Sequence, residues 1–222
     1  MRQFWRAVWA LVWKDLLLEV RSKEVLTPVA VFALLVVALF NFLFGARPGV
    51  AAAVAPGVLW ASLTFAAALG LGRSFALERE KGALDGLLLC PVGREALYTG
   101  KLLAIFLLLT GMEVLLLPLF ALFFNLPFLT PAVWGVVLLA TLGLSAVGVL
   151  LSAMAAATRA REVLLPVLLF PLLLPVIIGA VEATGSLWRG TGETARWVGL
   201  TAAFDALFLV LGATLFGFVL EE

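Results

Sequence analysis

Few side chains in this 222-residue sequence are suited to catalysis or metal binding. The chain has no histidine, which is the most frequent metal ligand in proteins and the commonest general acid or base. Its single cysteine, Cys90, excludes an intrachain disulfide, and no histidine exists to activate it as a nucleophile. The sequence therefore disfavours a zinc enzyme and excludes haem ligation through imidazole.

The sequence also lacks a nucleotide-binding loop. The phosphate loop has the pattern G-x-x-x-x-G-K-[ST], but the Gly-Lys pair at 100–101 has Glu95 where the first glycine should stand. We therefore expect any ATP to bind a partner chain and no cofactor to bind this one. The net charge of +1 gives no indication of a nucleic-acid partner.

Two acidic residues, Glu113 and Asp205, lie within long apolar runs. A carboxyl group in hydrocarbon is costly and is by default a functional candidate. Glu113 can bias a conformational switch or pair across a dimer, or it can hydrogen-bond a serine or threonine of a neighbouring helix, which we favour. Asp205 can pair with a cation or cap a helix break, and the sequence does not decide between these. Two isolated acids are too few for an intramembrane enzyme.

The composition predicts the elements that hold these residues. Hydrophobic residues make up 64% of the chain and charged residues 13%, with a mean hydropathy of +1.17. A soluble domain is about 45–50% apolar and about 25% charged. We therefore expect an all-α polytopic membrane protein, a single transmembrane domain over residues 1–222. Its six spans are predicted at 28–45, 50–74, 97–124, 132–157, 163–183 and 197–220.

Two patterns refine this layout. In residues 1–25, Trp5, Trp9 and Trp13 recur every fourth residue, which indicates one helical face and favours a helix lying in the membrane interface over a solvated lead-in. In the fifth span, Pro166, Pro171 and Pro175 predict kinks or a broken helix.

The distribution of lysine and arginine predicts the orientation. With both termini in the cytoplasm, 12 of the 15 basic residues lie on the cytoplasmic side and 3 outside. The positive-inside rule therefore places the loop between spans two and three, residues 75–96, in the cytoplasm.

This loop belongs to the longest charge-rich stretch, residues 73–101. Leu84, Leu87 and Leu88 repeat at helical spacing and predict a short helix with one apolar face, which Pro91 ends. Such a helix, tied to two spans, has the form of a coupling element that docks in a groove of a soluble partner. The alternative is an ordinary loop helix.

Several segments resemble the CcmB family of cytochrome c maturation proteins, the permeases of haem exporters. Residues 75–92, FALEREKGALDGLLLCPV, resemble the cytoplasmic loop of that family, and residues 14–24, KDLLLEVRSKE, resemble its N-terminal segment. Further likenesses are APGVLW at 55–60, Gly-Lys at 100–101 and LPVLLFPLLLP at 165–175. The order of these segments, over nearly the whole chain, carries the resemblance.

The resemblance implies a fold like that of ABC-2 type exporters, in the inner membrane, with an interfacial helix, six spans and a coupling helix. It implies a homodimer that binds the cytoplasmic ATPase CcmA, with CcmC, CcmD and the periplasmic haem chaperone CcmE. In such a complex ATP hydrolysis is expected to serve release of the haem-loaded chaperone, and no residue of this chain is catalytic. The residues implied in docking the ATPase are Glu78, Arg79, Glu80, Gly82, Leu84, Leu87, Leu88 and Pro91.

The alternative within the same class is a permease of another ABC-2 exporter, for lipid, polysaccharide or drug. It predicts the same coupling helix, a wide central cavity and no dependence on CcmC. Whether any substrate crosses the dimer is not decided by the sequence.

Overall fold

The structure is a computed structural model that describes residues 2–23, 26–44, 48–80, 93–127, 129–156 and 161–219. Side chains are described for these residues except 48, 51, 72–80, 156 and 161–163. Over these ranges the chain forms seven helices and no strand, as the sequence predicts. The helices are α1 (Arg2–Ser22), α2 (Leu26–Phe44), α3 (Pro48–Glu80), α5 (Arg94–Phe124), α6 (Pro131–Ala156), α7 (Arg161–Arg189) and α8 (Thr194–Val219).

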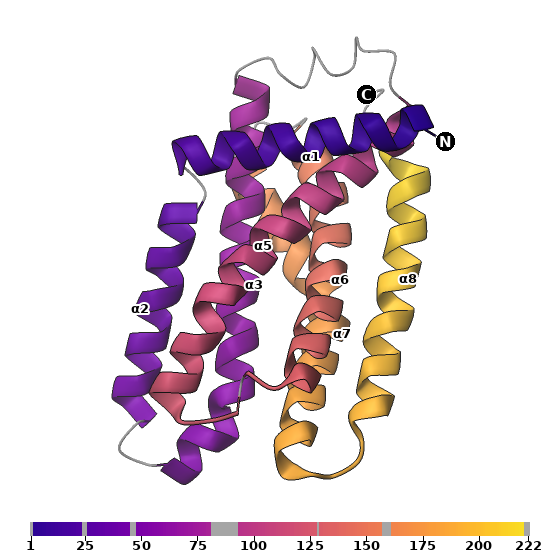
Figure 1. Cartoon of the computed structure of the whole chain (residues 1–222). Helices are drawn as coiled ribbons and strands as arrows, with labels where there is room; N and C mark the ends of the chain where they lie inside the picture. Colours follow the sequence, from indigo (N-terminus) through magenta and orange to yellow (C-terminus); the bar gives the residue numbers. More distant parts are fainter. Residues whose placement is uncertain are drawn as a thin grey trace.

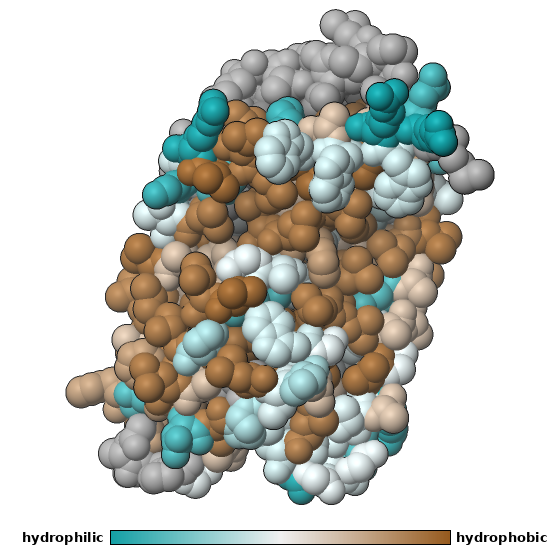
Figure 2. All heavy atoms as spheres, in the orientation of Figure 1, coloured by the Kyte–Doolittle hydropathy of each residue, from teal (hydrophilic) through white to brown (hydrophobic). Residues whose placement is uncertain are grey.

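Six of these helices are long and apolar enough to cross a membrane, namely all except α1. They form an upright bundle, and α1 lies across one end of it (Figure 1). On the face that Figure 2 shows, apolar side chains cover most of the middle of the bundle, whereas hydrophilic side chains gather toward its two ends. The chain is therefore a multi-pass membrane protein.

Helix α6 is the centre of the bundle. It contacts α3, α5, α7 and α8, and most of its side chains are buried, whereas few side chains of α2, at the edge, are buried. Small residues allow the close approach of its neighbours, because Gly148 on α6 leaves the space that Leu71 of α3 occupies. Gly148 belongs to the Gly148-x₃-Ser152 spacing of small residues that is typical of packed membrane helices.

Helix α7 is not the broken helix that the sequence predicted as one alternative. It runs without a break from Arg161 to Arg189 although it contains three prolines. Each proline removes only one backbone donor, and contacts with α3, α6 and α8 hold the helix on several sides. The helix also continues past 183 to Arg189, where a turn begins that places Gly190 and Gly192 at positive φ.

Candidate functional site

The predicted docking residues fall at the edge of what the structure describes. Glu78, Arg79 and Glu80 form the last turn of α3, but their side chains lie outside the described set. Gly82, Leu84, Leu87, Leu88 and Pro91 lie outside the described residues. The structure does describe the helix that this segment enters, because α5 begins at Arg94 directly after Gly93.

The first turns of α5 pack tightly against α1. A Cβ atom at Gly100 would lie 2.9 Å from Leu11 Cδ1 and 3.0 Å from Leu11 Cβ, so glycine allows the two helices this close approach. Next to it, Lys101 Nζ lies 2.9 Å from Asp15 Oδ2, and these two side chains are only 6% and 12% exposed. We call these four residues the α1–α5 junction. The packing of Leu11 on Gly100 and the ion pair hold α1 against the beginning of α5.

The same part of α5 is tied to α8 and α6. Arg94 Nη1 donates to the carbonyl oxygen of Gly217, near the end of α8, at 2.8 Å. The Tyr98 hydroxyl lies against Gly212 of α8 and donates to the carbonyl oxygen of Ala146 on α6 at 3.3 Å. The first turns of α5 therefore contact α1, α6 and α8 directly.

Helix α1 is also coupled to α2. Glu19 is 6% exposed, and its Oε1 atom accepts a hydrogen bond from the backbone N–H of Leu26 at 2.6 Å. Leu26 is the first residue of α2, so the carboxylate satisfies one of the donors that a helix N-terminus leaves free. The first residue of α2 is thereby held to α1.

Glu113 lies deep in the bundle, 12 residues along α5 from Lys101 and thus about 18 Å further along the axis. It is 2% exposed, and Thr141 of α6 donates a hydrogen bond to its Oε1 atom. The carboxyl group therefore bonds a neighbouring hydroxyl, the alternative that the sequence favoured. Because the side chain is enclosed within one chain, this position does not offer it for pairing across a dimer.

Asp205 approaches α6 from α8. Its side chain is 2% exposed and lies over Gly143, which leaves the space for it. Neither carboxyl oxygen has a hydrogen-bond partner among the described residues. Because α8 is continuous from Thr194 to Val219, Asp205 does not cap a helix break. Glu113 and Asp205 thus contact the central helix separately, at Thr141 and Gly143.

The described side chains include no group of three or more cysteine, aspartate or glutamate residues placed to hold a metal ion. This region connects helices to one another. The charged segment joins α3 to α5, and the start of α5 is held by three other helices.

Comparison with known proteins assigns the family. The family model described as CcmB protein matches residues 6–221. The chain belongs to the CcmB family. Similar relatives are the proteins named heme exporter protein B of Rhodobacter capsulatus, Paracoccus denitrificans and Haemophilus influenzae. The first is 37% identical over 205 residues, covering 89% of this chain and 93% of the relative. The second is 36% identical (78% and 80% covered), and the third 30% identical (90% and 85% covered).

The contacts that hold α5 in this CcmB chain were not identified from the sequence. Asp15 and Glu19 are spaced i, i+4, and they continue the face that carries Val8, Leu11 and Val12. That spacing is a usable signal, because acids on the buried face of an interfacial helix require partners inside the protein. The sequence showed that Lys101 is a charged residue at the start of a span. It did not indicate that its partner is Asp15, 86 positions away.

Proposed function

We propose that this CcmB chain is the permease subunit of a haem-export machinery, and that it transmits ATP hydrolysis by a separate subunit into the membrane. The names of the three relatives support the first part. The second part rests on the α1–α5 junction together with the continuity of the charged segment with α5. The chain itself is non-catalytic in this proposal and binds no cofactor.

The end of the bundle that carries α1 is proposed to face the cytoplasm, with both termini on that side and the protein in the inner membrane. Of the basic residues whose side chains are described, seven lie at that end and two, Arg189 and Arg196, at the other. The seven are Arg2, Arg6, Lys14, Arg21, Lys23, Arg94 and Lys101. This asymmetry favours the cytoplasmic placement by the positive-inside rule.

The docking element is proposed to be the segment 78–91, with Glu78, Arg79, Glu80, Gly82, Leu84, Leu87, Leu88 and Pro91 contacting the ATPase CcmA. A force on this segment acts on the last turn of α3 and the first turn of α5. Because α5 is held to α1 through Leu11 and Asp15 and to α8 through Arg94, these helices move together. That arrangement converts a local push at the docking element into a movement of several spans.

The assembly is proposed to contain two copies of this chain, CcmA, CcmC and CcmD, and to act on the periplasmic chaperone CcmE. ATP binds the CcmA subunits, and haem is handled by the complex. Hydrolysis then serves to release the haem-loaded chaperone. No nucleic acid takes part.

Charge reversal and apolar disruption in the docking segment test this proposal. Glu80→Lys or Leu84→Asp is expected to abolish co-purification of the ATPase, while the chain still inserts in the membrane. Glu95→Lys is the matched control, because Glu95 is exposed on the first turn of α5, just outside the segment. Undiminished ATPase binding in the two docking variants would refute the proposal. An ATPase that co-purifies without any haem-handling partner would instead favour another ABC-2 exporter.

A further inference from the structure

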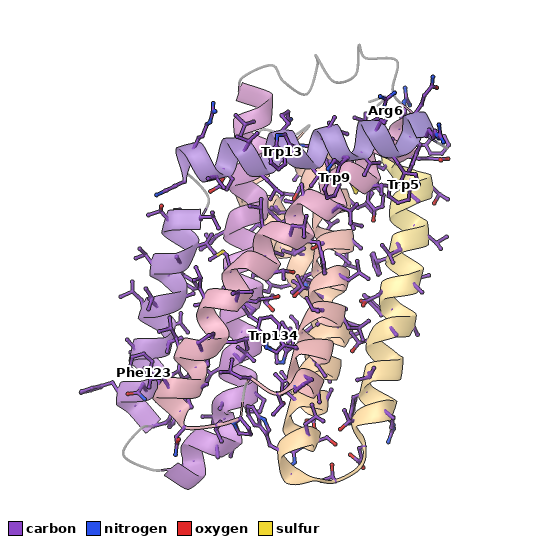
Figure 3. The ribbon with its side chains drawn as sticks, in the orientation of Figure 1. Trp5, Arg6, Trp9, Trp13, Phe123 and Trp134 are labelled. Carbon is purple, nitrogen blue, oxygen red and sulfur yellow. The ribbon has the colours of Figure 1, made fainter. Side chains whose placement is uncertain are left out.

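Helix α1 has three sides: one toward the bundle, one that carries a row of tryptophans and one that faces away from the bundle. The face toward the bundle buries Val8, Leu11 and Val12 against α5. A second face carries Trp5, Trp9 and Trp13, which are 58%, 63% and 60% exposed. These tryptophans form a row along one side of α1, whereas Arg6 lies on the edge away from the bundle (Figure 3).

The charges of α1 are sorted by sign between these faces. Both of its acids point inward, because Asp15 pairs with Lys101 and Glu19 bonds the N–H of Leu26. Most of its cations point outward, although Lys14 is half-buried and also pairs with Asp15, 2.9 Å away. Arg2, Arg6 and Arg21 of α1 are exposed. Lys23, the residue after the end of α1, is exposed as well. The described outer surface of α1 is therefore cationic, although its sequence contains acids.

The tryptophan row fixes the depth of this cationic surface. Exposed tryptophans favour the headgroup level of a bilayer, where the ring is partly apolar and its N–H finds polar partners. Helix α1 lies across the end of the bundle, directly above the apolar band (Figures 1 and 2). With the tryptophans at that level, the neighbouring arginines and lysines would lie close to the lipid phosphates.

An apolar groove opens below the end of α1 at which α2 begins. It is formed by α2, α3 and α5, and no lining residue has a polar side chain. Its lining is Leu26, Val29, Ala66, Gly70, Leu71, Ile105, Leu108, Leu109 and Met112. Lys23 lies one turn before this groove, since the N–H of Thr27 donates to the Lys23 carbonyl oxygen at 3.2 Å.

We propose that α1 is a binding surface for anionic phospholipid. The exposed cations bind the lipid phosphates, and the tryptophan row contacts the headgroup region. An acyl chain of a lipid held near Lys23 packs over the groove between α2, α3 and α5. Each cation near an anionic surface increases lipid partitioning roughly fivefold, so four of them give a strong local preference.

Quenching of tryptophan fluorescence by brominated lipids tests this. The full chain is reconstituted in phosphatidylcholine with a minor fraction of phosphatidylglycerol, with bromine on one lipid or the other near the carbonyl end. Trp134→Phe, Trp188→Phe and Trp197→Phe remove three reporters outside α1. Trp60 remains, but it is 1% exposed and bonds Thr184, so lipid does not reach it. The α1 tryptophans then report the local lipid.

We expect brominated phosphatidylglycerol to quench severalfold more than its bulk fraction predicts. Combined Arg2→Gln, Arg6→Gln, Arg21→Gln and Lys23→Gln should remove the excess, whereas Arg189→Gln with Arg196→Gln, at the other end, should preserve it. About 1 M salt, which shortens the Debye length to about 3 Å, should reduce the excess in the unaltered chain. Equal quenching by the two lipids in the unaltered chain, or an excess that survives neutralisation, would overturn the proposal.

A water-soluble competitor distinguishes lipid binding from binding of any phosphate. Glycerophosphoglycerol, the phosphatidylglycerol headgroup without acyl chains, should leave the quenching excess unchanged even when added well above the lipid concentration. Displacement of the lipid by this compound would show a headgroup-only site and would overturn the proposed acyl-chain position over the groove.

Discussion

The ammonium group of Lys101 on α5 lies 2.9 Å from the carboxylate of Asp15 on α1, and neither side chain is more than 12% exposed. The two residues are 86 positions apart, so the ion pair joins the interfacial helix to the helix that follows the charged segment. Beside it, Leu11 fills the space over Gly100. The two contacts make α1 and the start of α5 one mechanical unit.

Removal of the Lys101 ammonium should loosen this unit. Lys101→Met leaves a largely buried carboxylate with only Lys14, whose side chain is 34% exposed and lies 2.9 Å from Asp15. We expect a loss of roughly 1–3 kcal/mol in stability and faster tryptic cleavage within α1. Lys14→Met is the control, because it leaves the buried pair in place. Equal effects of the two substitutions, by thermal unfolding and proteolysis in detergent, would contradict the assigned role of Lys101.

The glycine contact can be tested by compensation. Gly100→Val places two methyl groups where Leu11 lies and should destabilise the chain by about 1–3 kcal/mol. Leu11→Ala in the same chain should recover most of that loss. Gly111→Val is the matched control, because a Cβ atom there meets no atom within 4 Å. Thermal unfolding measures the stability of each variant. If Leu11→Ala does not restore the stability that Gly100→Val removes, the result argues against the observed contact.

The buried carboxyl group of Glu113 depends on Thr141. Thr141→Val keeps the shape of the side chain but removes the donor, so we expect a loss of about 1–3 kcal/mol, whereas Thr141→Ser should retain most stability. Thr214→Val serves as control, because the Thr214 hydroxyl is exposed and bonds only backbone carbonyls of its own helix. If Thr141→Val and Thr214→Val are equally stable, the hydrogen bond to Glu113 does not hold α5 to α6.

The overall layout was predictable because hydrophobicity and helix length are local properties. The six apolar runs, the lead-in with its tryptophan row and the absence of strands in the described chain follow from composition and spacing alone. Helix ends were less predictable. The second span was predicted to end at residue 74, but α3 continues to Glu80. The fifth span was predicted to end at 183, but α7 continues to Arg189 through polar residues such as Thr184, whose hydroxyl bonds its own helix.

The site was predictable only in part, because its contacts join distant segments. The sequence indicated that Glu113 bonds a neighbouring hydroxyl, but not that Thr141 supplies it. It gave no indication that Lys101 pairs with Asp15 or that Arg94 reaches Gly217, since such partners depend on how α1 and α8 pack around α5. The docking residues from 82 to 91 lie outside the described residues, and their role remains a prediction.

Crosslinking from the charged segment tests the proposed coupling most directly. A photoreactive phenylalanine analogue replaces Leu84, Leu87 or Leu88 in turn, in membranes that contain the ATPase subunit. The account predicts a covalent product with the ATPase from at least one of these positions, and none from Glu193, which lies in the turn at the other end of the bundle. Co-purification of the ATPase with no crosslink from any of the three leucines would contradict it.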